Sequence, residues 1–311
     1  MEYAVELENL SKSFGNQEVL KKISFKVPKG TVFGLLGPNG AGKTTAIRIM
    51  SCLMEPTGGD VRILGKSIHS NRKEIRRIVG CVTESPGIYN RLSVWDNLEF
   101  FAHCYELPKN ERSLRIETLL KQFNLWKRKD DPAGSLSKGM KQKVSIICAL
   151  LHDPEVLFFD EITANLDPIS IREMKNQIKD WVNSGKTIIY CSHTLSEVDE
   201  LCHQFAIIDG NVISLTTPQK FREEWSMYNV SMKLESNHSQ AEMIFRNAPE
   251  IVAFEQDGGE YKLKVDNPDS NNYQLLKKLV SLNIPVTYIQ KISVTLEDSY
   301  HALLKSDRGE I

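Results

Sequence analysis

The sequence predicts an α/β protein, with a largely parallel sheet in a main domain and a smaller α+β domain after it. In the first part of the chain, short apolar segments alternate with segments of helical spacing, which is the order of an α/β domain. The apolar segments have no polar face, so we expect strands that are covered on both sides of the sheet. These segments span residues 31–36, 79–83, 156–159 and 187–190.

Two changes in this pattern predict where the chain is divided. Residues 94–105 and 111–123 indicate successive helices with no strand between them, so we expect a helical subdomain at about residues 86–152. After Pro218 the order becomes strand, helix, hairpin, helix, strand and helix, which is typical of a ferredoxin-like fold. We therefore expect a main domain over residues 1–217 and a small accessory domain over residues 218–311. The elements expected in the accessory domain are a strand at 230–234, a helix at 240–247, a hairpin turning at 257–259, a helix at 273–282, a strand at 286–290 and a helix from 296.

Composition argues against several classes of function. The 311 residues exceed the usual length of one domain, and 41% of them are apolar, which is enough for a substantial core. Because the formal net charge is only −1, no surface-wide field favours nucleic acid, and we expect no nucleic-acid partner. The six cysteines show no close paired spacing, which indicates buried thiols in a reducing cytosol. We find neither a secretory signal nor an apolar run of membrane-spanning length, so we expect the chain to stay outside the lipid.

The most specific motif is a glycine-rich loop between an expected strand and an expected helix. It matches the phosphate-binding pattern G-x-x-x-x-G-K-[ST] in the setting that the pattern requires. Its glycines allow backbone N–H groups to form a concave nest, and the start of the helix adds positive potential, so both favour phosphate. A chance glycine-rich turn is the alternative, and the flanking strand and helix argue against it. The loop comprises Gly37, Pro38, Asn39, Gly40, Ala41, Gly42, Lys43, Thr44 and Thr45.

The charged and hydroxyl residues of this loop have separate expected roles. Lys43 should reach the β- and γ-phosphates of ATP, and the Thr44 hydroxyl should ligate Mg²⁺. Thr45 should meet the α-phosphate region. The sequence therefore predicts ATP and Mg²⁺ as the ligands of this loop.

Two carboxylates follow the apolar strand at residues 156–159. Such a strand places Asp160 at the carboxyl edge of the sheet beside the phosphate loop, where it can hold Mg²⁺ through water. Because adjacent residues on a strand point in opposite directions, Glu161 is available to polarise the water that attacks the γ-phosphate. A solvated strand end is the alternative interpretation, and the nearby phosphate loop argues against it.

A third motif gives the chain its resemblance to a known family. The residues at 136–140, Leu-Ser-Lys-Gly-Met, resemble the signature motif of the ATP-binding subunits of ABC transporters, with departures at Lys138 and Met140. The resemblance covers roughly residues 2–217 and implies a P-loop NTPase core of ABC type, with an antiparallel β subdomain and a helical subdomain. It also implies that Ser137 and Gly139 meet the γ-phosphate held by a second copy of the chain. A plain helix cap is the alternative for Ser137.

Other positions match this family less completely. The resemblance implies that Phe14 stacks on adenine, with a core position as the alternative, and that Glu84 takes the place of a Mg²⁺-binding glutamine. It implies that His193, at a strand end, contacts the γ-phosphate and positions water. Residues 164–167 resemble the loop through which the two subunits sense each other, with departures from the usual pattern at Ile162, in place of a proline, and at Asn165, in place of a common glycine.

Together the motifs and the resemblance imply one function. The chain should bind and hydrolyse ATP, with Lys43, Glu161 and His193 as catalytic residues. It should power transport, as export, through a separate membrane permease that holds it on the cytoplasmic face of the membrane. It should work as an ATP-dependent dimer of two copies. In the family, the permease docks on the helical region. The aromatic cluster in this region could contribute to that docking surface, and a plain core position is the alternative for each of its members, Tyr89, Trp95, Phe100 and Phe101.

Export rests on a further resemblance. Residues 294–300 resemble the tail of ATPases from bacterial drug, antibiotic-peptide and sodium exporters, although Thr295 and Asp298 also fit a capping box. A soluble ABC-type ATPase with a non-transport partner is the main alternative, disfavoured because we find neither a coiled-coil insertion nor a fused second ATPase unit. A binding or regulatory module whose nucleotide site is only structural is disfavoured, because the expected hydrolytic residues Glu161 and His193 are both present. A GTPase is disfavoured because no Asn-Lys-x-Asp segment occurs.

Overall fold

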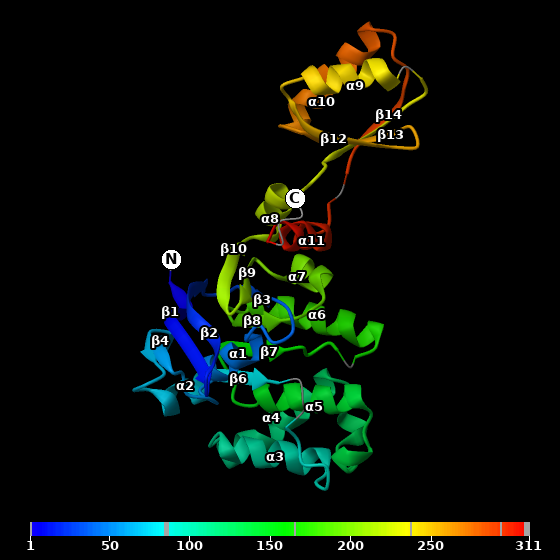
Figure 1. Ribbon diagram of the computed structural model, residues 1–311. Helices are drawn as coiled ribbons and strands as arrows, with labels where there is room; N and C mark the ends of the chain where they lie inside the picture. The colour runs from blue at the N-terminus through cyan, green and yellow to red at the C-terminus, as the bar shows by residue number, and fades with distance from the viewer. Residues whose placement is uncertain (1, 84–86, 165, 237, 293, 308–311) are drawn as a thin grey trace. The chain divides into compact units, whose positions relative to one another are not determined.

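The computed structural model describes residues 2–83, 87–164, 166–236, 238–292 and 294–307 (Figure 1). The chain divides into two compact units, Met1–Thr217 and Pro218–Ile311. Each unit has a hydrophobic core of its own.

The first unit contains a six-stranded sheet with the strand order β10-β9-β3-β8-β7-β6. The pairs β3–β8, β3–β9, β7–β8 and β6–β7 are parallel, while β9–β10 is antiparallel. Every residue of β3, β7 and β8 is buried, which confirms the prediction of apolar strands covered on both faces. The strands are β3 (Val32–Leu36), β6 (Val79–Val82), β7 (Val156–Asp160), β8 (Thr187–Cys191), β9 (Gln204–Asp209) and β10 (Asn211–Thr216).

A four-stranded antiparallel sheet with the order β2-β1-β4-β5 precedes and follows the first helix in the chain. Its apolar face includes Val5, Leu7 and Val61, which share one core with Ala46 and Ile47 of α1. This packing places the β1–β2 hairpin against the helix that begins at the phosphate loop. The elements are β1 (Tyr3–Phe14), β2 (Gln17–Pro28), α1 (Lys43–Met50), β4 (Gly58–Ile63), β5 (Lys66–Ser67) and α2 (Arg72–Ile78).

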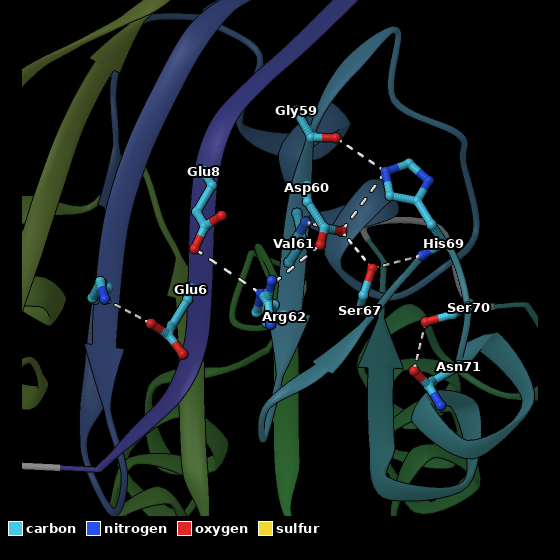
Figure 2. Close-up of polar contacts among 11 residues, drawn as sticks. Glu6, Glu8, Gly59, Asp60, Val61, Arg62, Ser67, His69, Ser70 and Asn71 are labelled. Atoms are coloured by element: carbon cyan, nitrogen blue, oxygen red, sulfur yellow. Dashed lines mark hydrogen bonds and ion pairs between the residues drawn. The ribbon is translucent and has the colours of Figure 1, made fainter.

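The opposite side of this antiparallel sheet carries charged side chains (Figure 2). Glu6 on β1 pairs with Lys26 on β2 at 2.7 Å, and Arg62 on β4 lies 4.0 Å from both Glu8 and Asp60. Exposed ion pairs of this kind contribute little to stability, because water screens the charges and ordering the side chains costs entropy. The sheet therefore owes its stability chiefly to the apolar face that packs on α1.

Helices fill the region between β6 and β7, as the sequence predicts. Tyr89 and Phe100 lie edge to face with ring centroids 5.2 Å apart, and they remain 51% and 42% exposed. Trp95 instead packs against Trp126, with centroids 6.4 Å apart. A core position is therefore wrong for Tyr89 and Phe100. The elements here are α3 (Val94–Cys104), α4 (Lys109–Gln122), η1 (Trp126–Arg128), η2 (Ala133–Ser135) and α5 (Lys138–Leu150).

Two more helices complete the first unit, α6 (Pro168–Asn183) after β7 and α7 (Leu195–Leu201) after β8. Each follows the carboxyl end of a parallel strand, so each begins near the edge of the sheet where the expected site residues lie. Within the described ranges, no helix combines the length and the apolar character needed to cross a membrane.

The second unit has the ferredoxin-like arrangement that its sequence pattern predicts. Its antiparallel sheet has the order β12-β13-β11-β14, so the hairpin strand β13 pairs with β11 and β11 pairs with β14. Phe245 of α9 and Leu275 of α10 share a core with the sheet residues Tyr261 and Leu263. The elements are α8 (Pro218–Trp225), β11 (Val230–Leu234), α9 (His238–Asn247), β12 (Ile251–Asp257), β13 (Glu260–Val265), α10 (Pro268–Ser281), β14 (Val286–Lys291) and α11 (Leu296–Asp307).

The last helix begins with the capping box that the sequence allows. The Asp298 backbone N–H donates to the Thr295 hydroxyl at 3.1 Å, and the Thr295 backbone N–H donates to the Asp298 carboxylate at 3.0 Å. These reciprocal bonds satisfy N–H groups that the first helical turn cannot pair internally. The helix that they start packs against α8.

The separate core of the second unit leads to a stability prediction. Phe245 is buried and contacts Tyr261 edge to face, with centroids 5.2 Å apart. We expect Phe245→Ala to destabilise the second unit by about 3–5 kcal/mol, because it removes apolar contacts and leaves a cavity. Calorimetry should show one transition at lower temperature and a second, belonging to the first unit, unchanged. Met243→Ala on the same helix is the control, since Met243 is 65% exposed; equal effects of the two variants would contradict the prediction.

Candidate active site

The predicted phosphate loop connects β3 to α1 (Figure 1). Two of its glycines are required by the backbone. Gly37 has φ +148°, and a Cβ added to it would lie 2.1 Å from the Ile208 carbonyl oxygen. Gly42 has φ +97°, and its added Cβ would lie 2.5 Å from the Leu20 side chain. The loop therefore fits between β9 and the β1–β2 hairpin only with glycine at these positions.

Lys43 and the start of α1 give this loop its positive character. Lys43 is buried, and its Nζ donates to the Gly37 and Pro38 carbonyls at 2.7 and 2.9 Å. Gly42, at the N-cap of α1, has no side chain to accept from the first N–H groups of the helix. Those N–H groups and the lysine thus face the same loop, an arrangement suited to phosphate. Thr44 and Thr45 lie in the first turn and are half-buried.

The register of the parallel strands brings Asp160 to the same level as the phosphate loop. Leu35 on β3 is paired with Cys191 on β8, and Cys191 is paired with Asp160 on β7. Because strands are spaced by about 4.8 Å, Asp160 lies roughly 10 Å across the sheet from Leu35, which is two residues before the loop begins. Asp160 is buried at this edge.

The pKa of the Cys191 thiol, on the strand between β3 and β7, reflects the charges around it. Burial raises the pKa of Cys191 well above its ordinary value, and the negative charge of Asp160 raises it further, while Lys43 lowers it. Charges have such effects only over short distances, so Asp160 and Lys43 both lie close to Cys191. The thiol itself stays protonated and unreactive.

Glu161 has an unusual backbone conformation for its residue type. Its φ is +54°, in the left-handed region that non-glycine residues rarely adopt. Its N–H donates to the Cys191 carbonyl at 3.0 Å, which helps to hold this conformation. Its carboxylate is 23% exposed and lies 3.4 Å from Nδ1 of His193. The two predicted catalytic side chains are therefore neighbours, and the strain is stored where the chemistry is expected.

A small cavity lies beside this pair. Its volume is about 280 Å³, and it has both polar and apolar walls. The loop expected to sense a second subunit contributes two residues to it, and Asp167, the last residue of that loop, caps α6 by accepting from the N–H groups of Ile169 and Ser170. The lining residues are Glu161, Thr163, Ala164, Leu166, Ile171, Ser192, His193, Thr194 and Glu197.

Comparison with known proteins decides the family of this nucleotide site. Residues 20–164 match the family described as "ABC transporter". The bacitracin transport ATP-binding protein BcrA of Enterococcus faecalis is 36% identical over 236 residues, which cover 74% of this chain and 76% of that protein. The chain belongs to the ABC transporter family. Because members of the family are ATPases, ATP binding and hydrolysis are the activity of this chain.

Other relatives of this ABC ATPase match both its length and its fold. The uncharacterized ABC transporter ATP-binding protein YhcH of Bacillus subtilis strain 168 is 31% identical over 313 residues, covering 100% of this chain and 99% of YhcH. The solved structure of an ATP-binding subunit of an ABC transporter has a TM-score of 0.67 at 32% identity, covering 72% of this chain and 94% of that one.

Some predicted site residues of the ABC ATPase are not brought to the phosphate loop within one chain. Ser137 caps α5 and accepts from the Met140 N–H at 3.2 Å, so the helix-cap interpretation holds. Through the described part of the chain, no hydrogen bond or ion pair connects Ser137 or Gly139 to residues 37–45. Glu84 and Asn165 lie outside the described residues.

Phe14 occupies the end of β1, on the hairpin whose Leu20 touches Gly42. Its ring is 49% exposed, and the Lys12 ammonium lies 5.1 Å from the ring centroid. A plain core position is therefore wrong for Phe14. An exposed ring on this hairpin of the ABC ATPase is available for stacking on a flat ligand.

Sequence reasoning overlooked Glu197, which lines the cavity and is buried. One signal could have identified it: a carboxylate four residues after His193, in the first turn of a helix that follows a strand end. The sequence contains no sign of its hydrogen-bond partners, because these come from separate strands and loops.

The glycine geometry of the ABC ATPase predicts a selective loss of nucleotide binding. Gly42→Ala should abolish ATP binding, because a φ of +97° is strained for alanine and the new Cβ would lie 2.5 Å from the Leu20 side chain and 3.1 Å from the Val19 carbonyl oxygen. Gly30→Ala is the matched control, since Gly30 also has positive φ, +67°, but has open space around it. It should cost about 1–2 kcal/mol of stability and leave ATP affinity intact. Titration with a fluorescent ATP analogue tests both variants, and normal binding by Gly42→Ala would contradict the assignment.

Proposed function

We propose that this chain powers export through a separate membrane-spanning partner, as a pair of copies that close over ATP and Mg²⁺. The observation that carries the proposal is the grouping of Lys43, Asp160, Glu161 and His193 at one edge of the sheet. Ser137 caps α5, and in the described part of its own chain no hydrogen bond joins it to that group. A site that needs both parts is completed by a second copy.

The oxygen atoms at the sheet edge suit Mg²⁺. The metal prefers hard oxygen ligands, and Asp160 supplies a buried carboxylate while Thr44 supplies a hydroxyl in the first turn of α1. These two residues would hold the ion, and Glu84 is proposed as a third ligand from its place in the sequence. When bound, Mg²⁺ neutralises charge on the β- and γ-phosphates.

Each charged side chain then has a distinct part in hydrolysis. Lys43 exchanges its bonds to the Gly37 and Pro38 carbonyls for phosphate oxygens and offsets their negative charge. Glu161 orients the attacking water and accepts its proton. His193 contacts the γ-phosphate and, with its Nδ1 3.4 Å from the Glu161 carboxylate, helps Glu161 to position the attacking water. Phosphoryl transfer needs positioning and charge neutralisation more than covalent chemistry, so these groups suffice.

The membrane partner is proposed to dock on the helical region of the chain. Tyr89 and Phe100 form an exposed aromatic pair there, and exposed aromatic residues are typical of interfaces. Asn97 holds the backbone beneath this pair, because its amide pairs with both the N–H and the carbonyl of Tyr89. The docked chain would then lie on the cytoplasmic face of the membrane.

Export is supported by the names of similar proteins. BcrA is named for bacitracin transport, and LnrL of Bacillus subtilis strain 168, 36% identical over 214 residues, is named for linearmycin resistance. One name concerns the transport of a compound and the other concerns resistance to one. We accordingly propose a drug-like or antibiotic-peptide cargo, selected by the membrane partner.

Replacement of Glu161 tests the hydrolytic mechanism. Glu161→Gln should lower kcat by about 10²–10⁴-fold, because the amide cannot accept the proton of the attacking water. The variant should still bind ATP and should accumulate as a dimer in sedimentation experiments with ATP and Mg²⁺. Glu155→Gln is the control. Glu155 directly precedes β7, whereas Glu161 directly follows it, and the Glu155→Gln variant should hydrolyse ATP normally. Adding Ser137→Ala should make the trapped dimer dissociate. A Glu161→Gln chain that stays monomeric with saturating ATP would refute the proposed dimer.

Co-purification distinguishes transport from the alternative of a soluble ABC-type ATPase with a non-transport partner. A tagged chain extracted in mild detergent should carry along an integral membrane protein, and the yield should fall when Tyr89 and Phe100 are both changed to Ser. Changing the exposed Leu114 on α4 to Ser is the control. Recovery of only water-soluble partners, with no membrane protein, would favour the alternative.

A further inference from the structure

Glu197 is a carboxylate that is only 5% exposed, in the first turn of α7. Its Oε2 atom accepts hydrogen bonds from three hydroxyls, those of Tyr190 at 2.7 Å, Ser192 at 2.8 Å and Thr163 at 3.0 Å. A carboxylate is unfavourable in the interior unless hydrogen bonds compensate for lost water. Carboxylate and hydroxyls therefore constrain one another, and the segments that carry them are held together.

Two of these hydroxyls belong to segments that carry the proposed catalytic residues. Thr163 follows Glu161 by two residues, and Ser192 directly precedes His193. The Ser192 hydroxyl also accepts from the backbone N–H of Thr194 at 3.0 Å, so the backbone is fixed on both sides of His193. One buried oxygen thus connects the loop after β7 with the loop after β8.

The two catalytic residues need such an anchor, because little packing restrains the His193 ring and because the Glu161 backbone is strained. His193 is 62% exposed, so few contacts restrict its ring. Glu161 has the left-handed backbone conformation, which persists only where surrounding structure enforces it. The placement of both side chains therefore depends on the backbone beneath them.

We propose that Glu197 is a positioning residue for ATP hydrolysis, which sets the separation of Glu161 and His193 through Thr163 and Ser192. The inference rests on the proposed roles of Glu161 and His193. In this role Glu197 contacts neither the nucleotide nor the attacking water. It maintains the 3.4 Å distance between the Glu161 carboxylate and Nδ1 of His193. A polar network that only supports the fold is the competing explanation, and it predicts loss of stability without a specific loss of turnover.

The variant Glu197→Gln separates the two explanations. It preserves size, but its neutral oxygen is a weaker acceptor for three converging donors, and its NH₂ group cannot accept at all. We expect kcat of the folded variant to fall by about 10²-fold, since small misplacement of catalytic groups has effects of that size. The KM for ATP should stay unchanged, because the phosphate loop is not part of the network.

Glu200→Gln is the matched control. Glu200 is on the same helix, but its carboxylate pairs with Lys175 and Lys179 at 2.7 and 3.0 Å on the surface. This variant should keep the turnover of the unmodified chain. A fall in kcat equal to that of Glu197→Gln would show that the loss comes from the helix rather than from the network.

A double-variant comparison makes the proposal specific. In a Glu161→Gln chain, adding Glu197→Gln should lower the residual kcat little further, because one of the two residues whose separation it sets is already disabled. Ser192→Ala and Thr163→Val, which each remove one donor, should lower kcat less than Glu197→Gln and should not add to it. If Glu197→Gln does not fold, these two milder variants carry the test through their kcat values.

Several results would overturn the proposal, besides an equal loss of kcat in Glu200→Gln. These are a folded Glu197→Gln chain with unchanged kcat, an equal proportional loss in the Glu161→Gln chain, and a raised KM with unchanged kcat. With an unfolded Glu197→Gln chain, unchanged kcat in both milder variants would likewise overturn it. Failure of the proposed function would be recognised by a different result: Glu161→Gln would then hydrolyse ATP as fast as the unmodified chain.

Discussion

Parallel pairing of β3, β8 and β7 is the constraint on which the rest of the site depends. Leu35, Cys191 and Asp160 lie at one level because of the register between these strands. The phosphate loop leaves the sheet just beyond Leu35, and the loops that carry Glu161 and His193 leave it beside Asp160 and Cys191. A shift of register by one residue would turn every side chain of a strand to the other face and separate these groups. The buried, apolar strands oppose such a shift, since each face packs against its own layer.

The site residues differ in how firmly they are held. Lys43 and Asp160 are buried beside a protonated thiol, in a region suited to strong interaction with phosphate and metal. Glu161 and His193 are more exposed than these two residues, and both line the small cavity beside the sheet edge. This difference fits the proposed mechanism, in which the ligand-binding groups are preformed and the hydrolytic pair depends on an internal anchor and on a second copy.

The second unit is organised independently of this site. Its core consists of residues from its own sheet and from α9 and α10. The full-length similarity to YhcH includes this unit, so the chain shares it with at least that relative. A separate core means that sequence changes there act first on the stability of the second unit itself.

The sequence by itself determined the features that depend on neighbours along the chain. The glycine pattern at 37–42, the apolar strand before Asp160, the Ser137 cap and the order of elements after Pro218 are all local signals, and the fold follows them. Only the tertiary structure decided the exposure of Phe14 and Tyr89, the left-handed backbone of Glu161 and the hydroxyl partners of Glu197. The reason is physical: these features depend on which strands pair, in which register, and how loops from different strands meet, and no short stretch of sequence encodes such contacts.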